Sequence, residues 1–534
     1  MLSNKQRFGS LFLFIIVCCV CWVSSFSQNI SFRSNIQYPR ILSNIWGYTD
    51  TLTHKEYALV GVETGLSIVD VTNPDVPIVL FFVPNDTSTW QEPKVWSHYA
   101  YMTNEQGGGL LIVDLGGLPL TMNYVKWSGI PNENYTRSHT CFIDENGILY
   151  LNGSNIFNRG SILCDLKPDP MNPVFLGKYD DFYVHDCFAR NDTLYTSEIL
   201  NGQFSVVDVH DKANPQVIAR QPTPFLFSHN VWLSDDGRFL FNTDERHFAP
   251  VTAYDISDLQ DIKEIEQYRH SDFDSSIPHN TYYRGGFLYT SYYRDGVTIA
   301  DAHKPDNIVE VGSYDTSPYP SGNGFEGCWG VYCFFPSGNI VCSDRQEGLF
   351  VLSPALKRAC YLEGNVTDLQ NGNPLPSITI EIVGESRYKV TDVLGNYKTG
   401  VADSGRYDVR FTDFGTYCFT RIISGVTLSP GNVTVLNAAL SCVLPMGIED
   451  LKMDFDFTVL PNLFTNTTLI RFHTSRESNS VISIFDGQGR KLKEFLIETT
   501  NAEIVLGEEL SAGIYFLKAE QEGSTETIQL IKTD

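Results

Sequence analysis

Gly65-Leu-Ser-Ile-Val-Asp70 is the stretch that decides the fold, because the same phrase recurs along most of the chain. Each copy has a small residue, an apolar run and a closing Asp. The further copies begin at Gly109, Gly160, Phe204, Val251, Gly296 and Gly348, and the last one lacks the Asp. Seven copies spaced by about 47 residues indicate a repeat architecture.

Each repeat contains four short β-rich runs separated by turn residues. In the first repeat the runs start at Ile45, Tyr57, Leu66 and Pro77. Four antiparallel strands in each of seven repeats are the blade pattern of a β-propeller. We therefore predict an all-β chain in which residues 28–357 form a seven-bladed β-propeller.

The strand count also predicts how the ring closes. The last repeat has only three strands before Ser353-Pro354, whereas residues 29–39 precede the first repeat without a partner. We expect this N-terminal segment to supply the fourth strand of the last blade. It would then tie the two ends of the propeller together.

The N-terminus has the pattern of a signal peptide. An apolar stretch at residues 11–23 follows a basic start, is short for a membrane span, and precedes the small-residue cleavage pattern Ser25-Phe-Ser27. Residues 1–27 are predicted to be removed on export, and no transmembrane segment is expected after cleavage. The alternative is a lipoprotein cysteine at Cys18, Cys19 or Cys21, whose preceding residues fit that pattern poorly.

The net charge limits the classes of partner, and the cysteines offer candidate disulfides. The chain has 534 residues and a net charge of −25, which argues against nucleic acid because phosphate binding needs a basic face. Export makes disulfides feasible. Cys333 and Cys342 flank a turn and are candidates to pair, and Cys360 is within reach of either Cys418 or Cys442.

Two smaller β-rich regions follow the propeller. Residues 358–442 alternate strands with Gly turns, which is typical of a small β-sandwich. Residues 443–453 have the composition of a linker. Residues 454–534 form a third β-rich region, for which we predict a second small β-sandwich.

The repeat region resembles a known family. The phrase Leu-x-Ile-Val-Asp, with Ser228-His-Asn-Val-Trp232, Pro278-His-Asn280 and Gly327-Cys-Trp-Gly330, is similar to the choice-of-anchor B family of LVIVD-repeat proteins. The resemblance covers about residues 28–355. It implies an exported propeller with a surface anchor, and it implies no agreed biochemical activity.

Each C-terminal region has a resemblance of its own. Residues 360–442 resemble carboxypeptidase regulatory-like domains through Thr391-Asp392, Gly395 and Tyr397, which implies an extracellular spacer that is not itself a peptidase. Residues 454–534 resemble the type A sorting domain of the type IX secretion system of Bacteroidota. The residues that carry this second resemblance are Pro461-Asn462, Phe464, residues 484–489, Gly513, Tyr515 and Lys532.

The resemblance to the sorting domain implies a localisation and a partner. It implies that the type IX secretion machinery is a partner and that the protein is exported through the outer membrane, then secreted or attached to the cell surface. Leu463 stands where the family usually has a second Pro, and the end Lys532-Thr-Asp534 is less basic than usual. The extracellular ligand stays unnamed at this point.

When the repeats are aligned on their phrases, a second set of residues occupies equivalent positions. These positions start the first strand of each blade, which lines the central axis of a propeller. They are Trp46, Trp90, His139, His185, His229, His279 and Trp329. Four neighbouring blades would therefore present an arc of histidines to the axis.

The arc has two interpretations. Neutral imidazole is a ligand for Zn, Fe, Cu or Ni, and nearby carboxylates orient it. Acidic residues end the second strands at Glu63, Glu105, Glu198, Asp244, Glu245 and Asp344. We favour a structural role, in which each buried His bonds to the next blade. The alternative is one divalent metal ion at His139, His185, His229 and His279, with Glu198 and Glu245 as carboxylate partners.

The closing Asp of the phrase has a structural interpretation. Asp70 precedes a turn at Thr72-Asn73-Pro74, where a carboxylate can accept hydrogen bonds from backbone N–H groups. We predict this role, in preference to calcium binding, for the closing Asp of each phrase.

Two functions from different classes stay open. Motifs of serine hydrolases, zinc proteases and P-loop enzymes are absent from the sequence. The first hypothesis is an exported propeller that acts as a binding module with no established catalytic activity. The second is a metal-dependent enzyme with its His and carboxylate site on the propeller axis.

Overall fold

The computed structural model describes residues 27–270, 275–385, 387–415, 417–442, 455–474, 480–486, 490–497, 499–507, 509–521 and 524–533. The predicted signal peptide up to residue 26 and the predicted linker lie outside these residues. The chain divides into two compact units, one ending at Ser441 and the other starting at Cys442. Every regular element among the described residues is a β-strand. These residues contain no helix long and apolar enough to cross a membrane.

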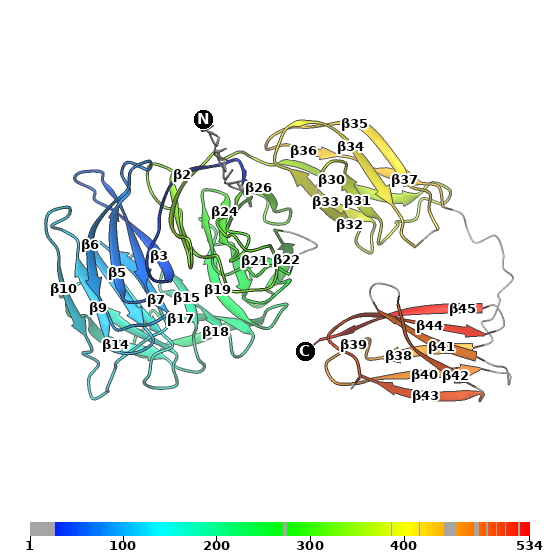
Figure 1. Ribbon diagram of the computed structural model, residues 1–534, viewed down its shortest axis with the longest axis horizontal. Helices are drawn as coiled ribbons and strands as arrows, with labels where there is room; N and C mark the ends of the chain where they lie inside the picture. Colours follow the sequence, from blue (N-terminus) through cyan, green and yellow to red (C-terminus); the bar gives the residue numbers. More distant parts are fainter. Residues whose placement is uncertain are drawn as a thin grey trace, which may run out of the picture. The chain divides into compact units, whose positions relative to one another are not determined.

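Each of the seven repeats forms one antiparallel sheet (Figure 1). The first sheet has β3 (Leu42–Thr49), β4 (Glu56–Val62), β5 (Gly65–Asp70) and β6 (Ile78–Pro84). The second has β7 (Gln91–Trp96), β8 (Tyr99–Asn104), β9 (Leu110–Asp114) and β10 (Asn123–Trp127). The third has β11 (Thr140–Ile143), β12 (Ile148–Asn152), β13 (Ser161–Asp165) and β14 (Val174–Tyr179).

The next three sheets repeat the same strand order. The fourth has β15 (Asp186–Arg190), β16 (Thr193–Glu198), β17 (Gln203–Asp208) and β18 (Gln216–Pro222). The fifth has β19 (Ser228–Leu233), β20 (Phe239–Asp244), β21 (Val251–Asp255) and β22 (Lys263–Tyr268). The sixth has β23 (Thr281–Arg284), β24 (Phe287–Ser291), β25 (Val297–Asp301) and β26 (Val309–Tyr314).

The seventh sheet is completed by the N-terminal segment. It contains β27 (Cys328–Tyr332), β28 (Ile340–Asp344), β29 (Gly348–Pro354) and β2 (Ile30–Ile36). β2 pairs antiparallel with β29, from Ile30 opposite Pro354 to Ile36 opposite Leu349. The predicted closure is therefore confirmed. The short strand β1 (Ser27–Gln28) was not predicted and extends the sixth sheet by pairing with β26.

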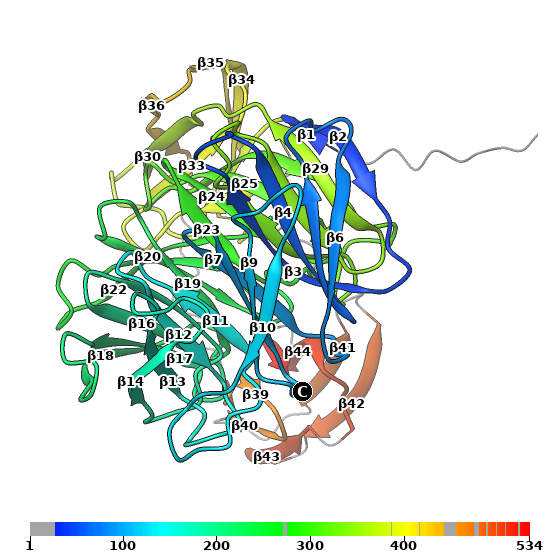
Figure 2. The ribbon, with the colours of Figure 1, turned by 90° about the vertical axis from the view of Figure 1, so that its left-hand side faces the viewer.

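The first strands of the sheets form the inner ring of the propeller (Figure 2). β3, β7, β11, β15, β19 and β23 contact one another in this order, and β27 contacts both β24 and β3. Aromatic and aliphatic side chains fill the spaces between successive sheets, among them Tyr57, Tyr150 and Tyr254. The prediction of an all-β propeller is confirmed, and the ring places the start of each first strand near one end of the axis.

The repeated phrase is scaffold. Its Asp accepts a hydrogen bond from the backbone N–H two residues later in six repeats, at Asp70, Asp114, Asp165, Asp208, Asp255 and Asp301. Gly348 has φ +95°, and a Cβ there would lie 2.2 Å from the backbone oxygen of Ile36 in β2. The Asp therefore stabilises the turn that follows the third strand, and Gly348 lets the fourth strand lie close to the third. The predicted role of the Asp is confirmed.

The region after the propeller forms two further sheets within the first unit. One contains β30 (Cys360–Asp368), β33 (Asn396–Val401), β36 (Val433–Val435) and β37 (Ala438–Leu440). The other contains β31 (Thr379–Ile382), β32 (Tyr388–Val390), β34 (Gly405–Thr412) and β35 (Arg421–Leu428). Arg387 of this region donates a hydrogen bond to the buried carboxylate of Glu310 in β26, so the region contacts the sixth sheet of the propeller.

The second unit has its own hydrophobic core, which includes Phe472, Ile484 and Leu517. Its three-stranded sheet contains β38 (Phe455–Leu460), β40 (Thr468–Thr474) and β43 (Asn501–Leu506). Its five-stranded sheet contains β39 (Leu463–Phe464), β45 (Ser524–Lys532), β44 (Gly513–Gln521), β41 (Ser480–Asp486) and β42 (Lys491–Ile497).

The cysteine pairing differs from the expectation. Cys333, Cys342 and Cys360 are free and buried, whereas Cys418 and Cys442 are disulfide-bonded. Cys333 lies beyond the end of β27 and has no partner opposite it in β28, because the register of this pair ends at Tyr332 and Val341. The proposed bridge between Cys333 and Cys342, and any bridge to Cys360, were therefore wrong.

Candidate metal centre

A cavity of about 290 Å³ opens on the propeller axis where the first strands begin. The predicted ring positions that line it are Trp90, His139, His185, His229, His279 and Trp329. The four imidazoles form a continuous arc, with successive ring centroids 3.9, 4.5 and 4.3 Å apart. The structure thus brings all four predicted histidines together on one side of the axis.

Hydrogen bonds from Thr side chains hold the backbone of this arc. The hydroxyls of Thr103, Thr140 and Thr243 donate to the carbonyl oxygens of His139, His185 and His279 in the next sheet, at 2.9, 2.6 and 2.6 Å. The backbone of the arc is therefore held to the neighbouring sheets without the rings of His229 and His279.

The ring position of the first sheet is Ser43, and the choice of Trp46 was wrong. Ser343 donates to the carbonyl oxygen of Ser43 at 2.6 Å, just as Thr243 donates to that of His279. Trp46 lies further along β3 and lines a separate cavity with Phe334. The spacing was misleading because β3 and β4, with eight and seven residues, are longer than the first and second strands of the other sheets.

His139 and His185 are tied to each other. Their Nε2 atoms are 3.0 Å apart, His139 Nδ1 bonds to the carboxylate of Glu105, and His185 Nδ1 lies 3.2 Å from the hydroxyl of Tyr183. Burial would lower the pKa of His139, but the hydrogen bond and charge of Glu105 outweigh it and raise that pKa. Burial, followed by the neighbouring histidines, lowers the pKa of His185 well below its ordinary value.

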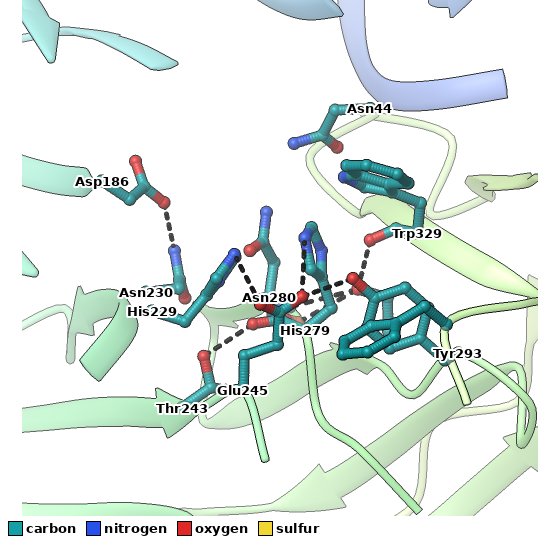
Figure 3. Close-up of polar contacts among 12 residues, drawn as sticks. Asn44, Asp186, His229, Asn230, Thr243, Glu245, His279, Asn280, Tyr293 and Trp329 are labelled. Carbon is teal, nitrogen blue, oxygen red and sulfur yellow. Dashed lines mark hydrogen bonds and ion pairs between the residues drawn. The ribbon is translucent and has the colours of Figure 1, made fainter. Parts of the chain in front are cut away.

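His229 and His279 have a different environment. Their Nδ1 atoms are buried, and neither has a hydrogen-bond partner among the residues that the structure describes. Their Nε2 atoms lie 3.9 Å from opposite oxygens of the Glu245 carboxylate, which is beyond hydrogen-bond range. Figure 3 shows Glu245 reaching toward both rings. Each imidazole thus has a buried Nδ1 atom without the hydrogen bond that such an atom normally makes.

Burial sets the charge of this second group. It lowers the pKa of His229 to about 4 and that of His279 well below its ordinary value, so both rings are neutral at pH 7. Burial also raises the pKa of Glu245 to about 7, although the hydroxyl of Tyr293, which donates to Oε1, opposes this shift. Ligand atoms of His229, Glu245 and His279 all lie within 4.8 Å of one another.

The two carboxylates chosen from the sequence lie in different places. Glu245 is in the cavity, because it directly follows the end of β20. Glu198 ends β16 but accepts hydrogen bonds from Tyr179, Ser205 and Thr196 inside the fourth sheet. Glu105, which directly follows β8, is the carboxylate that contacts His139.

Four further cavity residues were not singled out from the sequence. Glu92 and Asp186 lie one or two residues beyond Trp90 and His185 on the first strands, and their carboxylates line the cavity. Arg345 follows Asp344 at the end of β28, and Tyr293 follows β24. Arg345 stands one residue beyond the end of its second strand, as Glu245 does, and this shared position is the signal that would have found it.

Three segments of the chain match models of known families. Residues 53–83 match the LVIVD repeat, residues 361–441 the carboxypeptidase regulatory-like domain, and residues 458–533 the secretion system C-terminal sorting domain. A solved structure of the Myceliophteria thermophila Cps50 (Swd1) β-propeller domain is similar at 10% identity and a TM-score of 0.43, over 60% of this chain and 99% of that chain. No curated protein matches the chain.

These matches define the class of protein. The chain is a β-propeller with an LVIVD repeat, followed by a carboxypeptidase regulatory-like domain and a sorting domain. The sorting domain indicates export through type IX secretion, to the cell surface or the medium, and so makes the secretion machinery a partner. The propeller and its axial cavity therefore work outside the cell.

Proposed function

We propose that this exported propeller is a binding module that holds one divalent transition-metal ion on its axis and presents it to an extracellular ligand. The observation that carries the proposal is the group of His229, His279 and Glu245. The Nε2 atoms of two buried neutral imidazoles flank the two oxygens of one carboxylate at 3.9 Å, without a hydrogen bond between them. A metal ion between these three side chains would bind both Nε2 atoms and the carboxylate.

The donor set fits a transition metal. Two histidines and one carboxylate are ligands typical of Zn²⁺ and of non-haem Fe²⁺, and three protein ligands leave coordination positions open. Metal–ligand bonds of about 2.0–2.2 Å place neighbouring ligand atoms about 3 Å apart. Closing the 3.9 Å separations to that value requires movements of about 1 Å.

His139 and His185 have a separate place in the proposal. Their mutual hydrogen bond and the Glu105 carboxylate already occupy three of their four nitrogen positions. We therefore assign them to the wall of the site and exclude them from the ligands that a first metal ion would use. The ring of His185 still lies only 4.5 Å from that of His229, so it contacts the ligand set.

Metal analysis of the full mature chain tests the proposal. The purified protein should contain about one zinc or iron ion per chain, and a chelator should lower its melting temperature. The double variant His229→Ala, His279→Ala should lose the metal and still give the circular dichroism of a folded β protein. His210→Ala is the matched control, because the His210 side chain is 86% exposed and is not among the residues that line the cavity. A metal-free wild type that also binds no added Zn²⁺ would exclude this function.

A metal-dependent enzyme is the second candidate. The open coordination positions favour it, because catalytic zinc sites keep a position for water or substrate. The buried carboxylates of Glu92 and Asp186 line the same cavity. Conversion of a bound ligand over time by the metal-loaded protein, and not by the double variant, would distinguish this candidate from a binding module.

A further inference from the structure

Two hydrogen-bond donors on the cavity wall lack acceptors. Arg345 Nε and Trp329 Nε1 are buried and make no hydrogen bond within the described residues. The Arg345 guanidinium lies 4.6 Å from the centroid of the Trp329 ring, and its Nη1 donates to the carbonyl oxygen of Phe325 at 2.9 Å. These contacts fix the side chain, but no carboxylate of the described chain pairs with it. The wall therefore presents an uncompensated positive charge.

Other parts of the cavity wall carry acceptors. Asn280 Oδ1 is buried without a partner among the described residues, while its Nδ2 donates to Tyr282 at 3.0 Å. Asp186 accepts hydrogen bonds from Asn230 at 2.9 Å and from the backbone N–H of Cys187 at 2.8 Å, and Glu92 accepts one from Asn44, so each carboxylate keeps lone pairs to spare. An occupant that donates hydrogen bonds to these groups would satisfy them.

Aromatic rings surround the entrance. Trp90 and Phe325 are 37% and 48% exposed, and both line the cavity. Tyr293 packs edge-to-face on Phe325 at 5.3 Å. Exposed aromatic faces beside polar groups are suited to a flat ligand that has both C–H and polar surface.

We propose that the axial cavity binds a hexuronic acid, with the carboxylate held by Arg345, Trp329 and the metal ion, and the hydroxyls by Asn280, Asp186 and Glu92. The proposal deepens the proposed function and rests on it, because the metal supplies one of the contacts to the carboxylate. An acidic sugar has the required pattern: acceptor oxygens at one end of a ring and hydroxyl donors around the rest. Neutral sugars lack the first feature, and simple carboxylates lack the second.

The size of the cavity adds a restriction. At about 290 Å³ it is at the lower end of the range for ligand pockets, which is about 300–1,000 Å³. It admits a single sugar ring, so a longer acidic chain would enter by its terminal residue only.

Calorimetric titration of the zinc-loaded full chain with galacturonic acid and glucuronic acid tests the proposal. At least one acid should bind about tenfold more tightly than galactose, acetate and inorganic phosphate, because a charge-assisted hydrogen bond contributes about that much. Arg345→Ala should remove this preference. Arg345→Lys should retain only part of it, because Lys keeps the positive charge but lacks the planar guanidinium that binds both oxygens of a carboxylate. Arg238→Ala is the control, since Arg238 is exposed and does not line the cavity.

Metal content, measured on the same samples, separates the two proposals. If the wild type and Arg345→Ala both hold zinc but neither acid binds better than galactose, the ligand assignment is wrong and the metal site stands. Phosphate or acetate binding as tightly as the acids would also overturn it. If the wild type binds no zinc, the proposed function fails and this inference fails with it.

Discussion

The closing Asp of each phrase caps a turn, and its contribution can be measured at a single residue. Asp255 accepts a hydrogen bond from the backbone N–H of Ser257 at 2.9 Å. Asp255→Ala should lower the free energy of unfolding by about 1 kcal/mol, which is typical of one lost hydrogen bond. Urea titration of the variant and of Asp261→Ala provides the comparison, since Asp261 makes only an exposed ion pair with Lys263 and should change little. Equal effects of the two changes would contradict the capping role.

Single residues also show where sequence reasoning ended. The phrase placed His139, His185, His229 and His279 on one arc because a fixed repeat length fixes the position of the backbone. It did not divide them into two pairs, because that division depends on side-chain partners such as Glu105, in the turn after β8, and Tyr183, in the loop between the third and fourth sheets. Glu245 was predictable as one of the acidic residues at the ends of the second strands, whereas Arg345 has the same position in the last sheet but the opposite charge and so falls outside that pattern.

Among the elements, β2 has the largest structural task, because it completes the last sheet with a strand from the other end of the propeller. Deleting residues 30–36 should lower the melting temperature by on the order of 10 °C or prevent folding, since the last sheet loses its outer strand and Ile30 leaves the core. Removing Gln28, the residue of β1 that remains after the predicted cleavage, deletes only its pairing with Ser313 of β26 and should have a much smaller effect. Comparable melting temperatures for the two deletions would refute this division of roles.

The strands themselves were largely predictable, because alternating apolar runs bounded by Gly, Pro and Asn require little tertiary context. The first sheet was the exception, because the extra length of β3 and β4 moves its ring position from Trp46 to Ser43. The completion of the last sheet by β2 was predictable from counting, whereas the pairing of β1 was not. A two-residue strand has too few residues to form a pattern.

At the scale of the whole first unit, a buried ion pair joins the propeller to the region that follows it. Glu310 of β26 accepts hydrogen bonds from Arg387, from Tyr268 and, at 2.9 Å, from His270. Burial would raise the pKa of Glu310, but Arg387 and His270 outweigh it and lower that pKa to about 2. The resulting stability is present above the unfolded pKa of about 4.5 and is lost as the pH falls from there toward 2.

The variant Glu310→Gln isolates this contribution. At pH 7 it should be less stable than the wild type by roughly 3 kcal/mol, and the difference should shrink as the pH falls below about 4.5. Urea unfolding at pH 7, 4.5 and 3 measures it, and limited proteolysis after residue 357 reports whether the two regions separate. A difference that does not change between pH 7 and pH 3 would show that Glu310 does not act as a charge.

The pairing of β2 with β29 also governs the order in which the chain can fold. The four main strands of each of the first six sheets follow one another in the chain. The seventh sheet is complete only after β29 has been synthesised and Pro354 has paired with Ile30 of β2. Loop-closure entropy is largest for this one contact, and distant pairings of this kind slow folding. We therefore expect the propeller to fold as an open spiral that becomes a ring in its final step, with the edge of β29 unpaired and exposed to chaperones, proteases and other chains until then.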